Sequence, residues 1–246
     1  ENGRQGDRVV IGDCPQFFFS PERDDDMPRA GRKIIDGLIY HVLNRGNEKR
    51  LIFADADDYL EFLDLMTRAQ ERFPINILAY CLMPNHFHLV VHVPVAAELA
   101  KNMHWLLSTH ARRFRSKWEG AGHVWQGRFK SFPVQSDHHL ITLFRYVEGN
   151  SVRAGLAKSC REWPWSSVRE REGEHSSGLL APLPVDLPGD WVSFVDQPLH
   201  AAERDAILLG VNKHVPLGDP MWQRQAAGWI EEKEVSRRGR PPTLRE

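Results

Sequence analysis

The chain has 246 residues, of which 41% are hydrophobic and 26% are charged, and its formal net charge is −1 at pH 7. This composition is ordinary for a globular domain with an appendage, and no apolar run is longer than a strand, which argues against a membrane-spanning helix. The three cysteines are widely spaced and odd in number, so they suggest neither a disulfide framework nor a zinc cluster. We therefore expect a cytoplasmic protein.

The net charge hides an uneven distribution of charge along the chain. Residues 1–26 contain seven acidic residues against three arginines. Residues 101–130 contain one acidic residue against seven basic residues: Lys101, Arg112, Arg113, Arg115, Lys117, Arg128 and Lys130. Because binding to a polyanion depends on where the charge lies as well as on its sum, this basic segment is compatible with a nucleic-acid partner.

Residues 1–26 show no usable periodicity and end in the acidic run ERDDD. The sequence MPRAGRK follows, so we interpret Met27 as the natural initiator and the preceding residues as a disordered N-terminal extension. We expect one domain over residues 27–170 and a C-terminal extension over residues 171–246.

The first part of the domain predicts a strand, a helix and a hairpin. A β-rich stretch that closes with turn residues predicts a strand over Leu38–Asn44. Residues 55–73 begin with acids suited to a helix N-terminus and continue with apolar side chains at helical spacing, which predicts a helix. Two apolar stretches, 75–83 and 86–93, are joined by a Pro-Asn pair, which is typical of a hairpin.

The second part of the domain predicts two further helices with a strand between them. Residues 96–118 predict a long helix whose last turns carry basic residues, which suits the helix dipole. Residues 123–135 predict a strand or a short hairpin around Gln126 and Gly127. A helix is expected from about residue 136 to residue 150.

The order β-α-β-β-α-β, followed by a third helix, is the ferredoxin-like arrangement. The expected fold class is therefore α+β, with an antiparallel sheet, helices on one face and a C-terminal irregular or helical extension. In that layout the other face of the sheet is open to a ligand.

The C-terminal extension differs in character from the domain. Its first part, EREGEHSSGLLAPLPVDLPGD, is rich in glycine, proline, serine and acids, which predicts a linker or an extended surface loop. Two later segments could form short amphipathic helices, and the basic end SRRGRPPTLRE is expected to be disordered when free.

Three histidines alternate in the apolar run HFHLVVHV. A strand places residues i, i+2 and i+4 on one face, so His86, His88 and His92 share a face. A His-x-His pair on a strand can offer two imidazoles to one metal ion, yet by spacing alone such a pair is more often a pair of ordinary polar residues on a solvated face. We interpret His92, and His138 and His139 at a helix start, as structural or surface residues.

Tyr146 and Asn150 are four residues apart, which places them on one face of the last helix of the domain. Tyrosine can act as a nucleophile, and asparagine can add an oxygen ligand to a metal site. Each has an ordinary alternative: a half-buried helix tyrosine and a helix C-cap.

Four stretches in order, YHVLNRGN, YCLMPNHFHLVV, HVWQGRFKSFPV and RYVEGNSVRAGL, together resemble the single-tyrosine HUH transposases, where U is a hydrophobic residue. The similarity is greatest to the branch of REP-associated tyrosine transposases, and it covers about residues 27–168. The resemblance implies that His86 and His88 bind a metal ion, that Asn150 completes the metal site and that Tyr146 is the nucleophile. Two residues depart from the family pattern. Relatives often have proline where this chain has Ser151, and Gly149 lies within the end of the expected helix.

The resemblance also implies the reaction and its cofactor. The expected activity is that of a metal-dependent single-strand DNA endonuclease and strand transferase, which acts on REP-type DNA hairpins through a 5′-phosphotyrosine intermediate. Imidazole ligands alone would favour zinc or another late metal, whereas the family implies Mg²⁺ or Mn²⁺. The protein is expected to act as a monomer or a homodimer.

Basic residues with interleaved aromatic residues fit a surface that neutralises phosphates while aromatic rings stack on unpaired bases. A solvated helix face is the alternative interpretation. The RRGRPP sequence resembles an AT-hook core, which would lie in a minor groove. The candidate DNA-binding residues are Arg112, Arg113, Arg115, Lys117, Arg128, Lys130, Arg153, Arg238 and Arg240.

Two other functions remain open at this point. A nucleic-acid-binding or regulatory protein could keep the same fold without cleavage, although such a protein has no need of His86, His88, Tyr146 and Asn150 together. A zinc hydrolase could use the histidine face, but the sequence shows no evident third strong ligand or general base near the pair.

Overall fold

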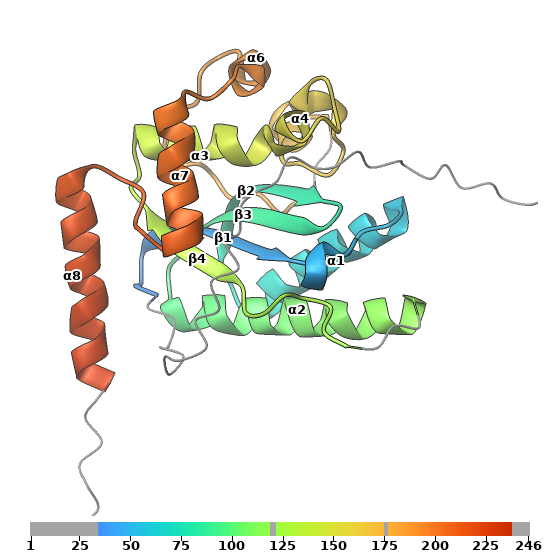
Figure 1. Ribbon diagram of the computed structural model, residues 1–246, viewed down its shortest axis with the longest axis horizontal. Helices are drawn as coiled ribbons and strands as arrows, with labels where there is room; N and C mark the ends of the chain where they lie inside the picture. The colour runs from blue at the N-terminus through green and yellow to red at the C-terminus, as the bar shows by residue number, and fades with distance from the viewer. Residues whose placement is uncertain (1–33, 119–121, 175–176, 238–246) are drawn as a thin grey trace, which may run out of the picture.

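The computed structural model describes residues 34–118, 122–174 and 177–237 (Figure 1). Residues 1–26, Arg238 and Arg240 therefore lie outside the described residues. The elements follow the chain in this order: β1 (Leu38–Arg45), η1 (Asn47–Lys49), α1 (Ala56–Arg72), β2 (Asn76–Met83), β3 (His86–Val93), α2 (Ala96–Trp118), β4 (Lys130–Val134), α3 (His138–Glu148), α4 (Asn150–Arg153), η2 (Cys160–Glu162), α5 (Val168–Arg171), α6 (Trp191–Asp196), α7 (Ala201–Lys213) and α8 (Pro220–Arg237).

The four strands form one antiparallel sheet in the order β2-β3-β1-β4. β1 lies inside the sheet and pairs with both β3 and β4. The two-residue turn between β2 and β3 confirms the predicted hairpin. The order agrees with the ferredoxin-like arrangement, and the α+β fold class is confirmed.

Local sequence accounts for the start of α1. The Asp55 carboxylate accepts a hydrogen bond from the backbone N–H of Asp58 at 3.0 Å, which caps the helix N-terminus. The capped helix then places one apolar side chain after another on the face that packs against the sheet. The predicted boundaries of α1 and α2 agree with the structure to within one or two residues.

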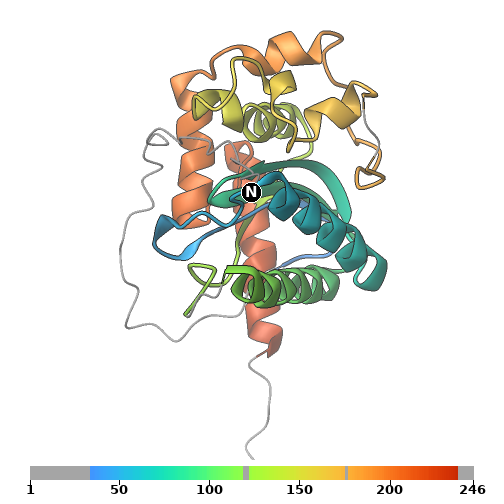
Figure 2. The same cartoon turned by 90° about the vertical axis from the view of Figure 1, so that its right-hand side faces the viewer.

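Helices α1 and α2 cover one face of the sheet, as Figures 1 and 2 show from two directions. The core on this side holds alternate residues of the strands together with the apolar faces of both helices: Tyr40, Val42, Leu82, Phe87, Leu89, Val91, Phe62, Leu65, Met66, Leu99, Met103 and Leu106. This half of the molecule is the expected helical layer.

The other face of the sheet, which carries His86 and His88, is also covered, contrary to the expectation that it would be open. Helix α3 packs across it, and α7 lies against β4 (Figure 1). A second core forms there from strand and α3 side chains: Ile39, Leu43, Cys81, Met83, Val90, Phe132, Leu140, Leu143, Phe144 and Val147. The reason is that α3 is itself strongly amphipathic and must bury its apolar face.

Segments that follow residue 150 cover both edges of the sheet. Along β2, the backbone N–H of Leu82 donates to Trp165 and the N–H of Ala181 donates to Ile77. Along β4, the N–H of Leu217 donates to Pro133. The segment predicted as a linker or surface loop therefore includes a stretch that is hydrogen-bonded to an edge strand. Covering an edge removes unpaired backbone groups that could pair with another chain.

Two boundaries differ from the sequence prediction. Residues 124–129 form an irregular segment rather than a hairpin, and β4 starts only at Lys130. The expected helix over residues 136–150 ends at Glu148, and a separate short helix begins at Asn150. At Gly149 between them, a Cβ atom would lie only 2.9 Å from the carbonyl oxygen of Arg145 and 2.9 Å from Arg153 Nη1, so only glycine fits there.

No helix within the described residues is long and apolar enough to cross a lipid bilayer.

Candidate active site

A cluster of aromatic side chains lies between the sheet and α3. His88 on β3 contacts the Tyr146 ring of α3 in an edge-to-face arrangement, with ring centroids 5.8 Å apart. His86 lies beside His88 at a centroid distance of 5.0 Å. His41 on β1 contacts both His88 and Tyr146, with centroids 5.0 and 6.1 Å away. Fold topology thus brings together three of the residues that the sequence singled out.

The histidines of this cluster are buried and neutral. Burial lowers the pKa of His41 to about 3, and burial together with the positive charge of Arg45 lowers the pKa of His86 to about 3. The pKa of His88 lies well below its usual value for the same main reason, burial, with Arg153 and the neighbouring imidazoles adding to the effect. A neutral imidazole keeps the lone pair that a metal ion requires.

Hydrogen bonds to the Nδ1 atoms orient these rings. His86 Nδ1 is 2.7 Å from Asn85 Oδ1. An amide oxygen can only accept, so Nδ1 carries the hydrogen and the lone pair of His86 is on Nε2. His88 Nδ1 is 2.8 Å from His41 Nε2. If His88 donates in this contact, its own lone pair is also on Nε2.

His41 was not a candidate in the sequence analysis. The signal that could have found it is a histidine at an inward-facing position of an otherwise apolar strand, in YHVL, where only a partnered polar group is tolerated. Its partner, His88, is 47 residues away in sequence, so the contact depends on strand pairing that the sequence pattern does not display.

Tyr146 lies against Arg153, and contacts with Arg153 help to fix the position of its ring. The Arg153 guanidinium is centred 4.5 Å from the centre of the Tyr146 ring and donates hydrogen bonds to the backbone carbonyls of Arg145 and Tyr146. Burial raises the pKa of the Tyr146 hydroxyl, and the positive charge of Arg153 opposes that rise. Arg153 is therefore placed beside the candidate nucleophile rather than on an exposed DNA-contacting surface.

Asn150 is fully buried at the start of α4. Both polar atoms of its amide are without a hydrogen-bond partner among the described residues. The backbone N–H of its neighbour Ser151 faces the thiol of Cys81, and Cys81 is the β2 residue paired with His88. The helix boundary at Gly149 means that Tyr146 and Asn150 belong to two consecutive helices, α3 and α4.

The donor set fits a divalent cation. His88 Nε2 is buried and makes no hydrogen bond to a described residue, as is true of the Asn150 amide. Buried polar atoms of this kind are rare in proteins and need an explanation. Nitrogen and oxygen donors of His86, His88 and Asn150 are chemically suited to such an ion.

A second group of side chains of types that can bind a metal ion lies at the start of α3. Single ligand atoms of Asp137, His138 and His139 lie within 4.8 Å of one another, so the group could hold a metal ion. Asp137 Oδ1 is already engaged: it accepts the backbone N–H of His139 at 2.8 Å and caps α3. Helix capping explains this arrangement without a metal.

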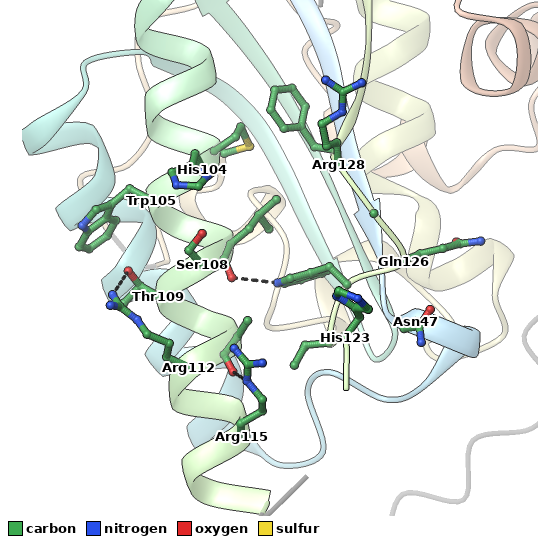
Figure 3. A pocket seen from close by; sticks show the side chains of 17 residues that line it. Asn47, His104, Trp105, Ser108, Thr109, Arg112, Arg115, His123, Gln126 and Arg128 are labelled. Atoms are coloured by element: carbon green, nitrogen blue, oxygen red, sulfur yellow. Dashed lines mark hydrogen bonds between the residues drawn. The ribbon is translucent and has the colours of Figure 1, made fainter. Parts of the chain in front are cut away.

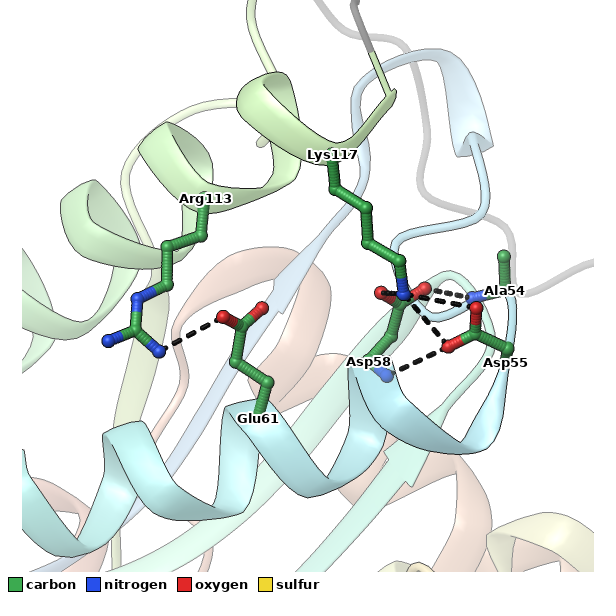
Figure 4. Close-up of polar contacts among 6 residues, drawn as sticks. All are labelled: Ala54, Asp55, Asp58, Glu61, Arg113 and Lys117. Atoms are coloured by element: carbon green, nitrogen blue, oxygen red, sulfur yellow. Dashed lines mark hydrogen bonds and ion pairs between the residues drawn. The ribbon is translucent and has the colours of Figure 1, made fainter.

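The structure separates the basic residues into different environments. Arg112, Arg115 and Arg128 line one groove (Figure 3). Arg113 and Lys117 instead form ion pairs with two acids of α1, Glu61 and Asp58, and with Asp55, which caps that helix (Figure 4).

Lys130 is partly buried on β4, and its ammonium lies 3.4 Å from the backbone carbonyl of Val211 in α7. Its side chain therefore points to α7 and not into the groove.

Comparisons with known proteins find similarity to transposases. Residues 34–150 match the family model described as "Transposase IS200 like". A Haemophilus influenzae protein with the provisional name REP-associated tyrosine transposase is 29% identical over 122 residues, which are 45% of this chain and 69% of that protein. A solved structure of a REP-associated tyrosine transposase bound to a REP hairpin has 18% identity and a TM-score of 0.49, and covers 71% of this chain and 100% of its own. A Deinococcus radiodurans protein, provisionally described as a transposase, has 20% identity and a TM-score of 0.34, and covers 50% of this chain and 98% of its own.

Proposed function

We propose that the chain is an IS200-like transposase, and with it a metal-dependent endonuclease and strand transferase of single-stranded DNA, because residues 34–150 match the family model of that description. Membership of a transposase family implies an enzyme that cleaves DNA. We propose that its substrate is a REP-type DNA hairpin, because the H. influenzae relative carries that name and the four sequence motifs resemble the same group.

The contact between Tyr146 and His88 carries this proposal. A phenol is the nucleophile that a phosphotyrosine intermediate requires. His88 and its neighbour His86 are neutral, buried nitrogen donors next to that phenol. A protein that only bound DNA would not need to bury these groups together, at the cost of their hydration.

The proposed reaction exchanges one phosphodiester for another. The Tyr146 oxygen attacks the scissile phosphorus, a bond forms between them, and the bond from phosphorus to the 3′ oxygen breaks. The phenol proton is lost and the departing 3′ oxygen gains a proton, which leaves a 5′-phosphotyrosine and a free 3′ hydroxyl. That hydroxyl can reverse the step on another strand, so no nucleoside triphosphate is required.

Arg153 supports the attacking oxygen. Burial disfavours a phenolate, and a guanidinium beside the ring offsets part of this cost. His86, His88 and Asn150 would hold a divalent ion, which we propose to be Mg²⁺ or Mn²⁺. When bound, such an ion polarises the scissile phosphate and offsets the negative charge of the transition state.

The test is incubation of the protein with end-labelled single-stranded hairpins and Mn²⁺ or Mg²⁺, followed by a denaturing gel. We expect a covalent protein-DNA band that needs the metal and is absent in Tyr146→Phe. Tyr80→Phe is the matched control, because Tyr80 is equally buried but belongs to the core under α1 and α2. Cleavage and covalent attachment that persist in Tyr146→Phe would refute the assignment of the nucleophile.

A second candidate function is supported by the burial of Tyr146, whose side chain is only 1% exposed. A DNA phosphate can reach the hydroxyl only if a covering segment moves. A nucleic-acid-binding protein on the same fold, without cleavage, needs no such movement. Hairpin binding without any covalent band, with either metal, would favour this second function.

A further inference from the structure

A groove runs between α2 and the irregular segment before β4 (Figure 3). Its volume is about 1070 Å³. The residues at its base are buried and mostly apolar: Met103, Leu107, Val124, Trp125 and Phe129. Trp125 is fixed in place, because its indole N–H donates to the carbonyl of Leu107 at 3.2 Å.

The walls of the groove are polar and basic. On α2, His104, Ser108, Arg112 and Arg115 follow one another at helical spacing, and all four are exposed. The opposite wall adds exposed side chains of His123, Gln126 and Arg128. The lining residues include three arginines and no aspartate or glutamate.

The groove arginines have no acidic partner within the described part of the chain. Arg112 donates to the hydroxyl of Thr109 at 3.2 Å, and Arg115 donates to the backbone carbonyl of Ala111 at 3.2 Å. Both contacts are with residues of their own helix and leave the positive charge uncompensated.

The neighbouring cations on α2 differ. Arg113 pairs with Glu61 at 3.0 Å, while Lys117 pairs with Asp58 at 2.7 Å and with Asp55 at 3.0 Å (Figure 4). These two cations join α2 to α1. The helix therefore has one basic face that is neutralised within the protein and another that is not.

A backbone hydrogen bond connects one end of the groove to the strands that carry the candidate active site. The N–H of Gln126 donates to the carbonyl of Arg45 at 2.9 Å. Arg45 is the β1 residue paired with His86. A chain lying in the groove could continue around this end of the sheet toward the histidines.

We propose that this groove binds a single-stranded segment of the DNA substrate, with Arg112, Arg115 and Arg128 on successive phosphates. The proposal rests on the proposed DNA-cleaving function and adds the residues that hold the strand. Three uncompensated arginines suit a polyanion. The apolar base suits unpaired bases, whose faces are hidden inside a duplex.

The experiment uses the full chain carrying Tyr146→Phe, in EDTA, so that binding is read without cleavage. The probe is a fluorescein-labelled oligodeoxythymidylate of about 12 nucleotides, a length within the range of single-strand sites, and the readout is fluorescence anisotropy against salt concentration. The assay needs neither metal nor the nucleophile. The groove proposal can therefore fail although the protein cleaves DNA, and the groove can bind the strand although the protein does not cleave it.

The double variant Arg112→Gln/Arg115→Gln is compared with Arg113→Gln/Lys117→Gln. Both remove two positive charges from the same helix, so long-range attraction falls equally. We expect the first to weaken binding at least about tenfold and to reduce the slope of log K against log salt by about 1.4, since each phosphate contact contributes about 0.7. The second should stay within about twofold of the parent protein, because Arg113 and Lys117 are already neutralised by Glu61, Asp55 and Asp58.

A second pair of variants leaves every arginine in place. Ser108→Glu puts a negative charge in the groove wall, whereas Ser116→Glu puts one on an exposed position of α2 that does not line the groove. Only the first should weaken binding, and thermal unfolding confirms that each variant is folded.

Three outcomes would overturn the proposal. The two double variants could weaken binding equally, which would indicate net charge alone. Both double variants could bind as tightly as the parent protein, which would indicate that the strand does not lie in the groove. A duplex of the same length could compete as well as the single strand, which would indicate a duplex-binding surface.

Discussion

At the scale of single residues, His41 shows how one buried side chain can orient another, here His88, which we propose as a metal ligand. Its Nε2 atom is 2.8 Å from His88 Nδ1, and burial keeps both rings neutral. A cation on His88 Nε2 selects the tautomer in which His88 Nδ1 donates to His41. If His88 is a metal ligand, as we propose, His41 is its positioning residue, in the way that outer-shell groups orient metal-binding histidines.

The expected consequence is a loss of metal affinity in His41→Phe of about 10- to 100-fold, because outer-shell partners of metal-binding histidines have effects of this size. His41→Gln should restore part of the affinity, since the amide oxygen can accept from His88 Nδ1. Isothermal titration with Mn²⁺ measures both.

The control for this prediction is His92→Phe. His92 lies on the same face of β3, but its ring contacts Asn76 instead of the cluster. Equal Mn²⁺ affinity in His41→Phe and the parent protein would contradict the positioning role.

At the scale of elements, α3 carries Tyr146, and a buried carboxylate of the same helix, Glu148, joins it to later parts of the chain. Glu148 is fully buried, pairs with Arg171 at 2.7 Å and accepts the indole N–H of Trp191 at 2.6 Å. These partners belong to α5 and α6, which follow the segment that matches the family model. The position of the candidate nucleophile thus depends on elements outside that segment.

We expect Glu148→Ala to lower the free energy of unfolding by about 3 to 5 kcal/mol, because it leaves Arg171 as a buried charge without its partner. Urea denaturation followed by circular dichroism measures the change. The matched control is Glu174→Ala. Glu174 likewise forms ion pairs, with Arg161 and Arg169, but it does so at the surface. Surface pairs contribute little, so an equal loss in both variants would show that burial is not the reason.

At the scale of the whole molecule, the sheet is enclosed on both faces and along both edges. The two layers of helices bury four histidines whose pKa values lie below the usual range: His41, His86, His88 and His110. The unfolded chain binds protons at these side chains near pH 6.5, and the folded protein does not. The part of the folding stability that depends on these four histidines is therefore fully present above that pH and is lost as the pH falls toward the folded-state pKa values.

His110 isolates this effect away from the candidate metal site. It lies between aromatic rings in the core under α1 and α2, and burial, partly opposed by Asp58, lowers its pKa to about 4. Between about pH 6.5 and about pH 4.5 the unfolding free energy of the parent protein falls. We expect the fall in His110→Leu to be smaller by about 2 kcal/mol, because the titrating imidazole is absent. Parallel declines in urea denaturation series would contradict the linkage.

The strands and main helices could be predicted from the sequence because each is encoded locally. The alternation in HFHLVVHV, the Pro-Asn turn and the acidic start of α1 depend only on neighbouring residues. The same local reasoning failed at Gly149, where one helix ends and the next begins, and where a Cβ atom would meet the carbonyl of Arg145 and the side chain of Arg153, which lies four residues further on.

The sequence by itself determined the fold class, the family resemblance and the identity of the candidate chemical groups, His86, His88, Tyr146 and Asn150. Only the tertiary structure decided that His41 joins them, that Arg153 lies against Tyr146, and which cations of α2 remain uncompensated. The physical reason is that burial and ion pairing are set by residues far apart in the chain. Arg112 and Arg113 are adjacent in sequence, yet one faces a groove and the other meets Glu61, 52 residues away.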